Sequence, residues 1–152
     1  MLTTMVPPMA AIASYLTDDH RHCDEAFLAI ERAIVDRRWE EAGDSLAVFT
    51  AAITRHFASE EELLFPAFEA ASGFATGPTM VMRMEHEQVN GLLESLRQEL
   101  AARNRDDCLG LFETLLMLMQ QHNAKEENIL YPMADRLLAA DAAGLVERMR
   151  AI

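Results

Sequence analysis

Apolar residues recur at intervals of three and four along most of this chain, which is the period of an amphipathic α-helix. Glycine and proline are few, with six and five in 152 residues, and runs of β-branched residues are absent. Polar breaks stand at residues 37–40, 72–78 and 103–107. The pattern predicts four long helices, at about residues 17–37, 40–65, 78–103 and 106–131, and a weaker fifth helix from about 142 to the end.

Short turns between consecutive helices favour antiparallel neighbours. We therefore expect an all-α fold, an up-down-up-down antiparallel four-helix bundle with a short C-terminal helix. About half of the residues are apolar, at 51%, which is enough for one sizeable core in a chain of 152 residues. We expect a single domain over residues 1–152 with its core at about 17–132.

The net charge of -12 works against a nucleic-acid partner or an anionic membrane surface, because both would be repelled. Met1–Tyr15 has no basic residue ahead of its modest apolar run, unlike a secretory signal peptide. The longest strongly apolar segment, Leu109–Met119, is far shorter than the ~20 residues of a membrane span. The only two cysteines, Cys23 and Cys108, suit a reducing compartment. We expect a soluble, cytoplasmic protein with no nucleic-acid or membrane partner.

A repeat with an offset of 66 residues carries most of the chemical information. At this offset, His20 matches His86, His56 matches His122, and Glu60 matches Glu126. Around the last two pairs the match widens to H-x-A-x-E-E-x-x-L-x-P, at residues 56–66 and 122–132. The repeat predicts a duplicated two-helix unit that builds one polynuclear metal site.

The four histidines are also placed symmetrically about the predicted turns. His20 and His56 lie 18 residues either side of position 38, and His86 and His122 lie 18 residues either side of position 104. Because every helical residue advances by ~1.5 Å, antiparallel helices return to the same height after equal numbers of residues. We therefore expect all four imidazoles at one level of the bundle.

The second and fourth predicted helices each offer a histidine and a glutamate at i,i+4, which places the two side chains on one face. Apolar residues at helical spacing indicate that these faces point toward the interior. They are Phe49, Ala52, Ile53 and Leu63 on one helix, and Leu115, Leu118, Met119 and Ile129 on the other. Burying such groups without partners costs several kcal/mol. A pair of metal ions would satisfy them.

Imidazole and carboxylate donors without thiolate suit iron, manganese or zinc. In this interpretation His20 and His56 bind one ion, His86 and His122 bind the other, and the two glutamates bridge them. Further polar residues near the predicted ligands have other expected roles. Asp24 and Asn90 are expected to hydrogen-bond ligands or bound water, with direct ligation by Asp24 as an alternative. Asp19 and Glu85 are expected to guard the site or be solvated, Glu61 and Glu127 to face outward or toward the flank of the bundle, and His22 to face solvent or support a ligand.

These motifs resemble the hemerythrin-like (HHE cation-binding) family of four-helix non-haem di-iron proteins. The resemblance covers residues 17–132 and rests on DDHRHCDEAF at 18–27, HFASEEELLFP at 56–66, EHE at 85–87 and HNAKEENILYP at 122–132. It implies two iron ions with an oxo or hydroxo bridge, with manganese or zinc as alternatives. The ligands it implies are His20, His56, Glu60, His86, His122 and Glu126.

Two departures separate the chain from the family's oxygen carriers. Those carriers have a second histidine where this chain has Asn90, and an aspartate bridge at a longer spacing than that of Glu126. The pattern is more similar to bacterial proteins linked to nitrosative stress and iron-centre repair. We expect a protein that binds dioxygen, nitric oxide or a related small oxidant such as peroxide, in sensing, storage or stress response. A di-iron enzyme that reduces peroxide or nitric oxide, an iron-centre repair protein, a ferritin-like oxidase and a purely structural helical module are alternatives.

Overall fold

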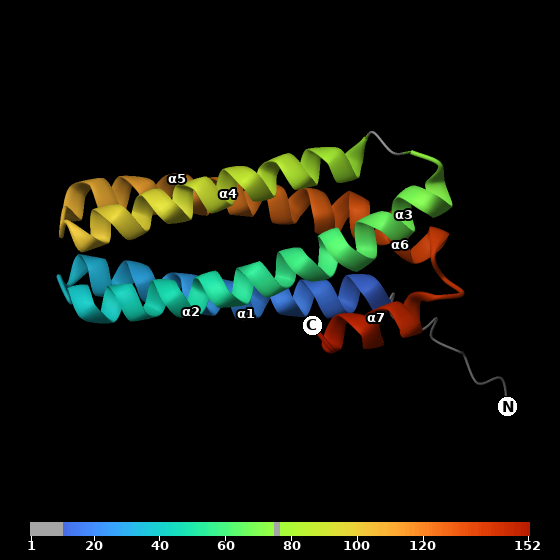
Figure 1. The fold of residues 1–152 in the computed structure, drawn as a ribbon, viewed down its shortest axis with the longest axis horizontal. Helices are drawn as coiled ribbons and strands as arrows, with labels where there is room; N and C mark the ends of the chain where they lie inside the picture. The colour runs from blue at the N-terminus through green and yellow to red at the C-terminus, as the bar shows by residue number, and fades with distance from the viewer. Residues whose placement is uncertain (1–10, 75–76) are drawn as a thin grey trace, which may run out of the picture.

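The computed structural model describes residues 11–74 and 77–152, which form helices joined by short turns (Figure 1). These residues form seven α-helices. At two places a π-helical turn, labelled η, joins one α-helix directly to the next. In chain order the elements are α1 (Ala11–Val35), α2 (Trp39–Ala58), η1 (Ser59–Leu64), α3 (Phe65–Ser72), α4 (Pro78–Ala101), α5 (Arg105–Lys125), η2 (Glu126–Leu130), α6 (Tyr131–Leu137) and α7 (Ala142–Arg150). The all-helical prediction is confirmed for these residues.

The long helices pack as two pairs, α1 with α2 and α4 with α5 (Figure 1). The pairs meet where α2 contacts α4 and where α1 contacts α5, which makes a helical bundle. The predicted turns at residues 37–40 and 103–107 join the helices within each pair. Helix α7 fulfils the prediction of a short C-terminal helix and packs against α1 and η1.

The first helix begins at Ala11, six residues before the predicted start at 17. Ile12 and Leu16 in this added stretch are fully buried. The carboxylate of Asp135 on α6 accepts hydrogen bonds from the backbone N–H groups of Ile12 and Ala13, both at 3.0 Å. A distant side chain thus caps this helix, and local sequence signals do not reveal such a cap.

The second and fourth predicted helices also continue beyond their expected ends at 65 and 131. After the π-helical turns, α3 and α6 carry the helical path on to Ser72 and Leu137. In each turn the backbone bonds to the fifth preceding residue, from Phe65 to Glu60 and from Tyr131 to Glu126. The prolines that follow take the first or second position of a new helix, where the missing N–H costs little.

Two apolar clusters fill the interior on either side of a polar layer. The first cluster includes Phe27, Phe49, Val89, Leu93, Phe112 and Leu115. The second cluster includes Leu16, Leu64, Phe68, Met82, Leu130 and Leu145. On α4, for example, His86 stands between Met82 of the second cluster and Val89 of the first. The polar layer is therefore closed off by apolar side chains at both ends.

One apolar residue predicted to face inward is exposed. Ile129 has 56% of its surface accessible, whereas Leu63, its equivalent in the first repeat, packs partly into the second cluster. Helix α7 contacts η1, which contains Leu63. The extra C-terminal helix therefore covers one repeat more completely than the other.

Within the described residues, no helix combines the length and the apolar character needed to cross a membrane. The expectation that the chain lacks a secretory signal rests largely on residues 1–10, which lie outside the described part.

Two arginines at the ends of α1 and α4 suggest a simple stabilising change. Arg37 and Arg103 have positive φ angles of 56° and 55°, and each ends its helix in a left-handed turn. Glycine adopts this conformation without the steric cost of a Cβ atom. We predict that Arg37→Gly and Arg103→Gly each raise the free energy of unfolding by up to about 1 kcal/mol, as measured by urea denaturation. A fall in stability of both variants would contradict this account of the turns.

Candidate metal centre

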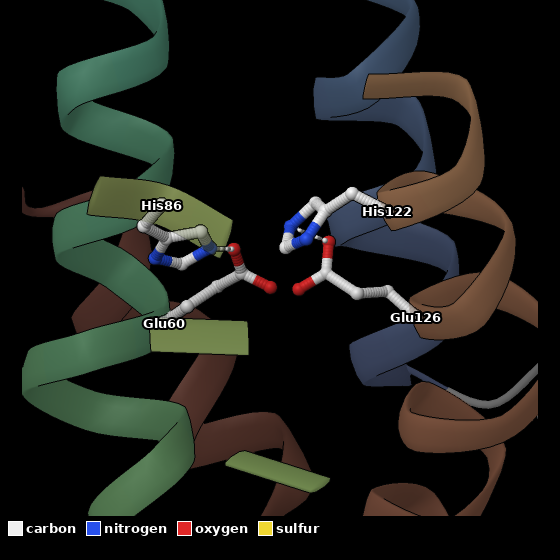
Figure 2. A group of neighbouring side chains, drawn as sticks. All are labelled: Glu60, His86, His122 and Glu126. Atoms are coloured by element: carbon white, nitrogen blue, oxygen red, sulfur yellow. Dashed lines mark ion pairs between the residues drawn. The ribbon is translucent and has the colours of Figure 1, made fainter. Parts of the chain in front are cut away.

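The structure brings all six predicted site residues together in the polar layer, and each is at most 3% exposed. Each comes from a different element: His20 from α1, His56 from α2, Glu60 from η1, His86 from α4, His122 from α5 and Glu126 from η2. Figure 2 shows four of them, with the carboxylates of Glu60 and Glu126 pointing toward each other between the two imidazoles. Packing against the two apolar clusters keeps these side chains away from solvent.

Each glutamate contacts one histidine from each repeat. Oε1 of Glu60 lies 3.3 Å from Nε2 of both His56 and His86. Oε1 of Glu126 lies 3.1 Å from Nε2 of both His20 and His122. Each carboxylate thus reaches both pairs of histidines, as a residue that bridges two ions must do.

The inward atoms lack hydrogen bonds that would satisfy them. Among the described residues, buried side-chain atoms without a hydrogen-bond partner include Oε1 of Glu60, Oε2 of Glu126, and Nε2 of His86 and His122. Buried polar atoms in native proteins are normally paired. Donor atoms of Glu60, His86, His122 and Glu126 lie within 4.8 Å of one another, and so do those of His20, His56 and Glu126. Each of these two groups of side chains could hold a metal ion.

The outer nitrogen of each of the four inward histidines faces a carboxylate. Nδ1 of His20 lies 3.3 Å from Glu127, and Nδ1 of His86 lies 3.2 Å from Glu61. Nδ1 of the other two histidines is held in the same way, that of His56 by Asp19 at 2.8 Å and that of His122 by Glu85 at 3.0 Å. A carboxylate in this position holds the Nδ1 proton and fixes the ring, so that Nε2 is the atom presented to the interior.

Glu61 and Glu127, which we expect to face outward or toward the flank of the bundle, are partly exposed, but each also contacts a buried histidine. Asp19 and Glu85 are likewise partners of histidines, rather than solvated charges. The four acids also repeat at the offset of 66, Asp19 with Glu85 and Glu61 with Glu127. That repeat was the sequence signal that could have revealed their shared role.

Asp24 and Asn90, which we expect to hydrogen-bond ligands or bound water, are exposed, and within the described residues neither makes a hydrogen bond to a predicted ligand. They lie one helical turn from His20 and His86, toward the first apolar cluster. His22 is exposed, in agreement with its position on the opposite side of α1 from His20.

Tyr131 is a site residue that the sequence analysis missed. It is fully buried, and its hydroxyl donates a hydrogen bond of 2.9 Å to Oε2 of Glu60. In a regular α-helix a residue five positions after Glu126 points about 140° away from it. The π-helical turn adds one residue to this part of the helix and brings Tyr131 onto the inward face.

The charges in this layer depend strongly on one another. Burial opposes a charge on His56, but the carboxylates of Glu60 and Asp19 outweigh it and raise the pKa of His56 to about 10. Burial similarly opposes a charge on His122, while Glu126 and Glu85 raise its pKa to about 9. These two imidazoles are therefore protonated near neutral pH when no metal is bound. A metal ion that binds Nε2 must displace those protons.

Three other buried groups, His20 and the two cysteines, are uncharged at neutral pH. Burial and the neighbouring His56 lower the pKa of His20 to about 4. Burial raises the pKa of the Cys23 thiol to about 12 and that of the Cys108 thiol to about 11. Both cysteines are free and buried, which agrees with a packing role.

A comparison with protein families agrees with this geometry. The family model described as hemerythrin HHE cation binding domain matches residues 11–134. Searches of curated proteins and of solved structures gave no match to the chain. The match spans α1 to α6 and includes all six residues of the buried cluster. With most of its length matched and a buried histidine and glutamate cluster suited to a metal, the chain belongs to the hemerythrin HHE cation-binding family.

Proposed function

We propose that the chain is a non-haem di-iron protein that binds dioxygen, nitric oxide or a related small oxidant in sensing, storage or a stress response. The observation that supports this most directly is the set of unsatisfied donor atoms in a buried layer. In this proposal His20 and His56 hold one ion, and His86 and His122 hold the other. Glu60 and Glu126 bridge the two ions, because each reaches a histidine of both pairs.

The donor types are compatible with iron. Four imidazoles and two carboxylates without a thiolate suit iron or manganese, as well as zinc. The negative charges of the glutamates and of the four outer acids offset the charge of two cations. When bound, iron would supply open coordination positions and reversible oxidation, which small oxidants and diatomic ligands require.

The protein's own residues keep the site dry and rigid. The apolar clusters above and below exclude water, and the carboxylates at Nδ1 fix the imidazole rings. The same proposal includes the up-down-up-down order of α1, α2, α4 and α5. It is supported by the short turns within each pair and by the contacts between the pairs.

We predict that purified protein takes up about two irons per chain, because the two donor groups share Glu126, and Glu60 lies 3.3 Å from a histidine of each pair. Azide or nitric oxide should then change the visible absorption spectrum of the iron-loaded protein. Metal analysis and titration with each ligand check this. Uptake of no iron would refute the proposal. A spectrum that none of these ligands changes would refute the ligand-binding function while leaving the iron site intact.

Removal of one inward histidine should lower the iron content. We predict that His86→Ala reduces the iron bound per chain by about half or more, because the remaining buried donors cannot complete both sites. His22→Ala is the matched control, since this histidine lies on the surface. Equal iron contents in the two variants would contradict the assignment of His86 as a ligand.

The outer carboxylates offer a finer test. We predict that Asp19→Asn and Glu85→Gln each weaken iron binding by roughly 10- to 100-fold, because the amide no longer holds the Nδ1 proton as firmly. Competition with a chelator measures the change. Asp18→Asn is the control, because Asp18 is exposed and pairs only with Arg21. An equal affinity for all three variants would show that these carboxylates do not support the metal.

A further inference from the structure

The two repeats differ at one position beside the polar layer. At the offset of 66, Tyr131 in the second repeat corresponds to Phe65 in the first. Both residues are fully buried and both follow a π-helical turn directly. The backbone therefore presents a phenol to one side of the site and a phenyl ring to the other.

The tyrosine hydroxyl lies among donor atoms from only one pair of histidines. Its Oη is 3.2 Å from Nε2 of His20 and 3.5 Å from Nε2 of His56. It is also 2.9 Å from Oε2 of Glu60 and 3.1 Å from Oε1 of Glu126. No such contact joins Oη to the other pair, His86 and His122, among the described residues.

These spacings equal those between neighbouring ligands of one metal ion. Ligand atoms about 2.1 Å from an ion and at right angles to each other are about 3 Å apart. The hydroxyl stands at about this distance from all four donor groups that surround the position of the first ion. A hydrogen bond needs only one acceptor, whereas a fifth ligand must be near all the others.

We propose that Tyr131 is a seventh metal-binding residue, which binds the ion held by His20 and His56 and makes the two halves of the site unequal. The inference rests on the proposed di-iron site and deepens it. On binding, the phenol gives up one proton to solvent and its oxygen becomes the ligand. A nearby cation stabilises that anion, although burial raises the pKa of Tyr131 well above its usual value in the metal-free chain.

The opposite half has no equivalent donor. The Phe65 ring lies 5.8 Å from the His86 ring, and the Phe57 ring stacks on His86 at 3.7 Å between centroids. Among the described residues, the protein ligands available to the ion held by His86 and His122 are therefore these two histidines and the two glutamates. An external small ligand is expected to bind that ion, because the tyrosine takes a position on the other.

The visible spectrum distinguishes a tyrosine ligand from a tyrosine that only donates a hydrogen bond. An oxidised iron bound to a phenolate has a broad visible charge-transfer band with tyrosine ring vibrations in its resonance Raman spectrum. A protonated tyrosine gives neither signal. The chain has only two tyrosines, so Tyr15→Phe is a matched control for Tyr131→Phe. Tyr15 lies apart from the site, with its ring against Arg150.

The expected result is a loss of the band and of the ring vibrations in iron-loaded Tyr131→Phe, with at least half of the iron content retained. Tyr15→Phe should keep both signals. The presence of Phe65 at the equivalent position shows that the same backbone accommodates phenylalanine. An identical spectrum of Tyr131→Phe and the unmodified protein at equal iron content would overturn the proposal.

The reverse substitution tests the same geometry from the other half. Phe65→Tyr should strengthen the band, because it offers a phenol to the ion held by His86 and His122. It should also weaken azide binding by tenfold or more, because that position is then occupied. If Tyr131→Phe does not fold or hold iron, Phe65→Tyr decides: an unchanged band and unchanged azide affinity overturn the proposal.

The two proposals fail in different ways. Absence of iron from the unmodified protein would refute the di-iron function itself. Normal iron content and azide binding without any tyrosine signal would refute only the role of Tyr131 as a ligand.

Discussion

The structure depends on the burial of six polar side chains in the middle of an apolar bundle. Four imidazoles and two carboxylates lie between the two apolar clusters, and several of their inward atoms lack hydrogen bonds. In an interior of low polarity such groups are costly unless they are paired or bind a metal. A cation bound by this cluster would satisfy the atoms that the packing has removed from water.

A layer of acids around the histidines supports this arrangement. Each imidazole is fixed on its outer side by a carboxylate and offers Nε2 to the interior. The outer acids are partly exposed, so they keep contact with water while they hold buried rings. Inner and outer acids together place much negative charge near the polar layer. This distribution suits the binding of cations.

The duplication gives the site its near symmetry, and small differences between the repeats remove part of it. Helix α7 covers the first repeat near η1, while Ile129 of the second repeat remains exposed. Tyr131 places a hydroxyl group on one side of the polar layer, whereas Phe65 places a phenyl ring on the other. In the proposed di-iron site, the two ions would therefore have unequal surroundings.

The sequence alone determined the number of long helices, the turns between them and the six residues that meet in the interior. These follow from local periodicity and from the repeat, since helix rise places equally spaced residues at equal heights. Tertiary structure decided where α1 begins, because its cap, Asp135, comes from a distant helix. It also decided which acids hold the histidines and which way Tyr131 points. Those features depend on contacts between helices and on one extra residue in a helical turn. Neither can be predicted from a sequence pattern that assumes a constant helical period.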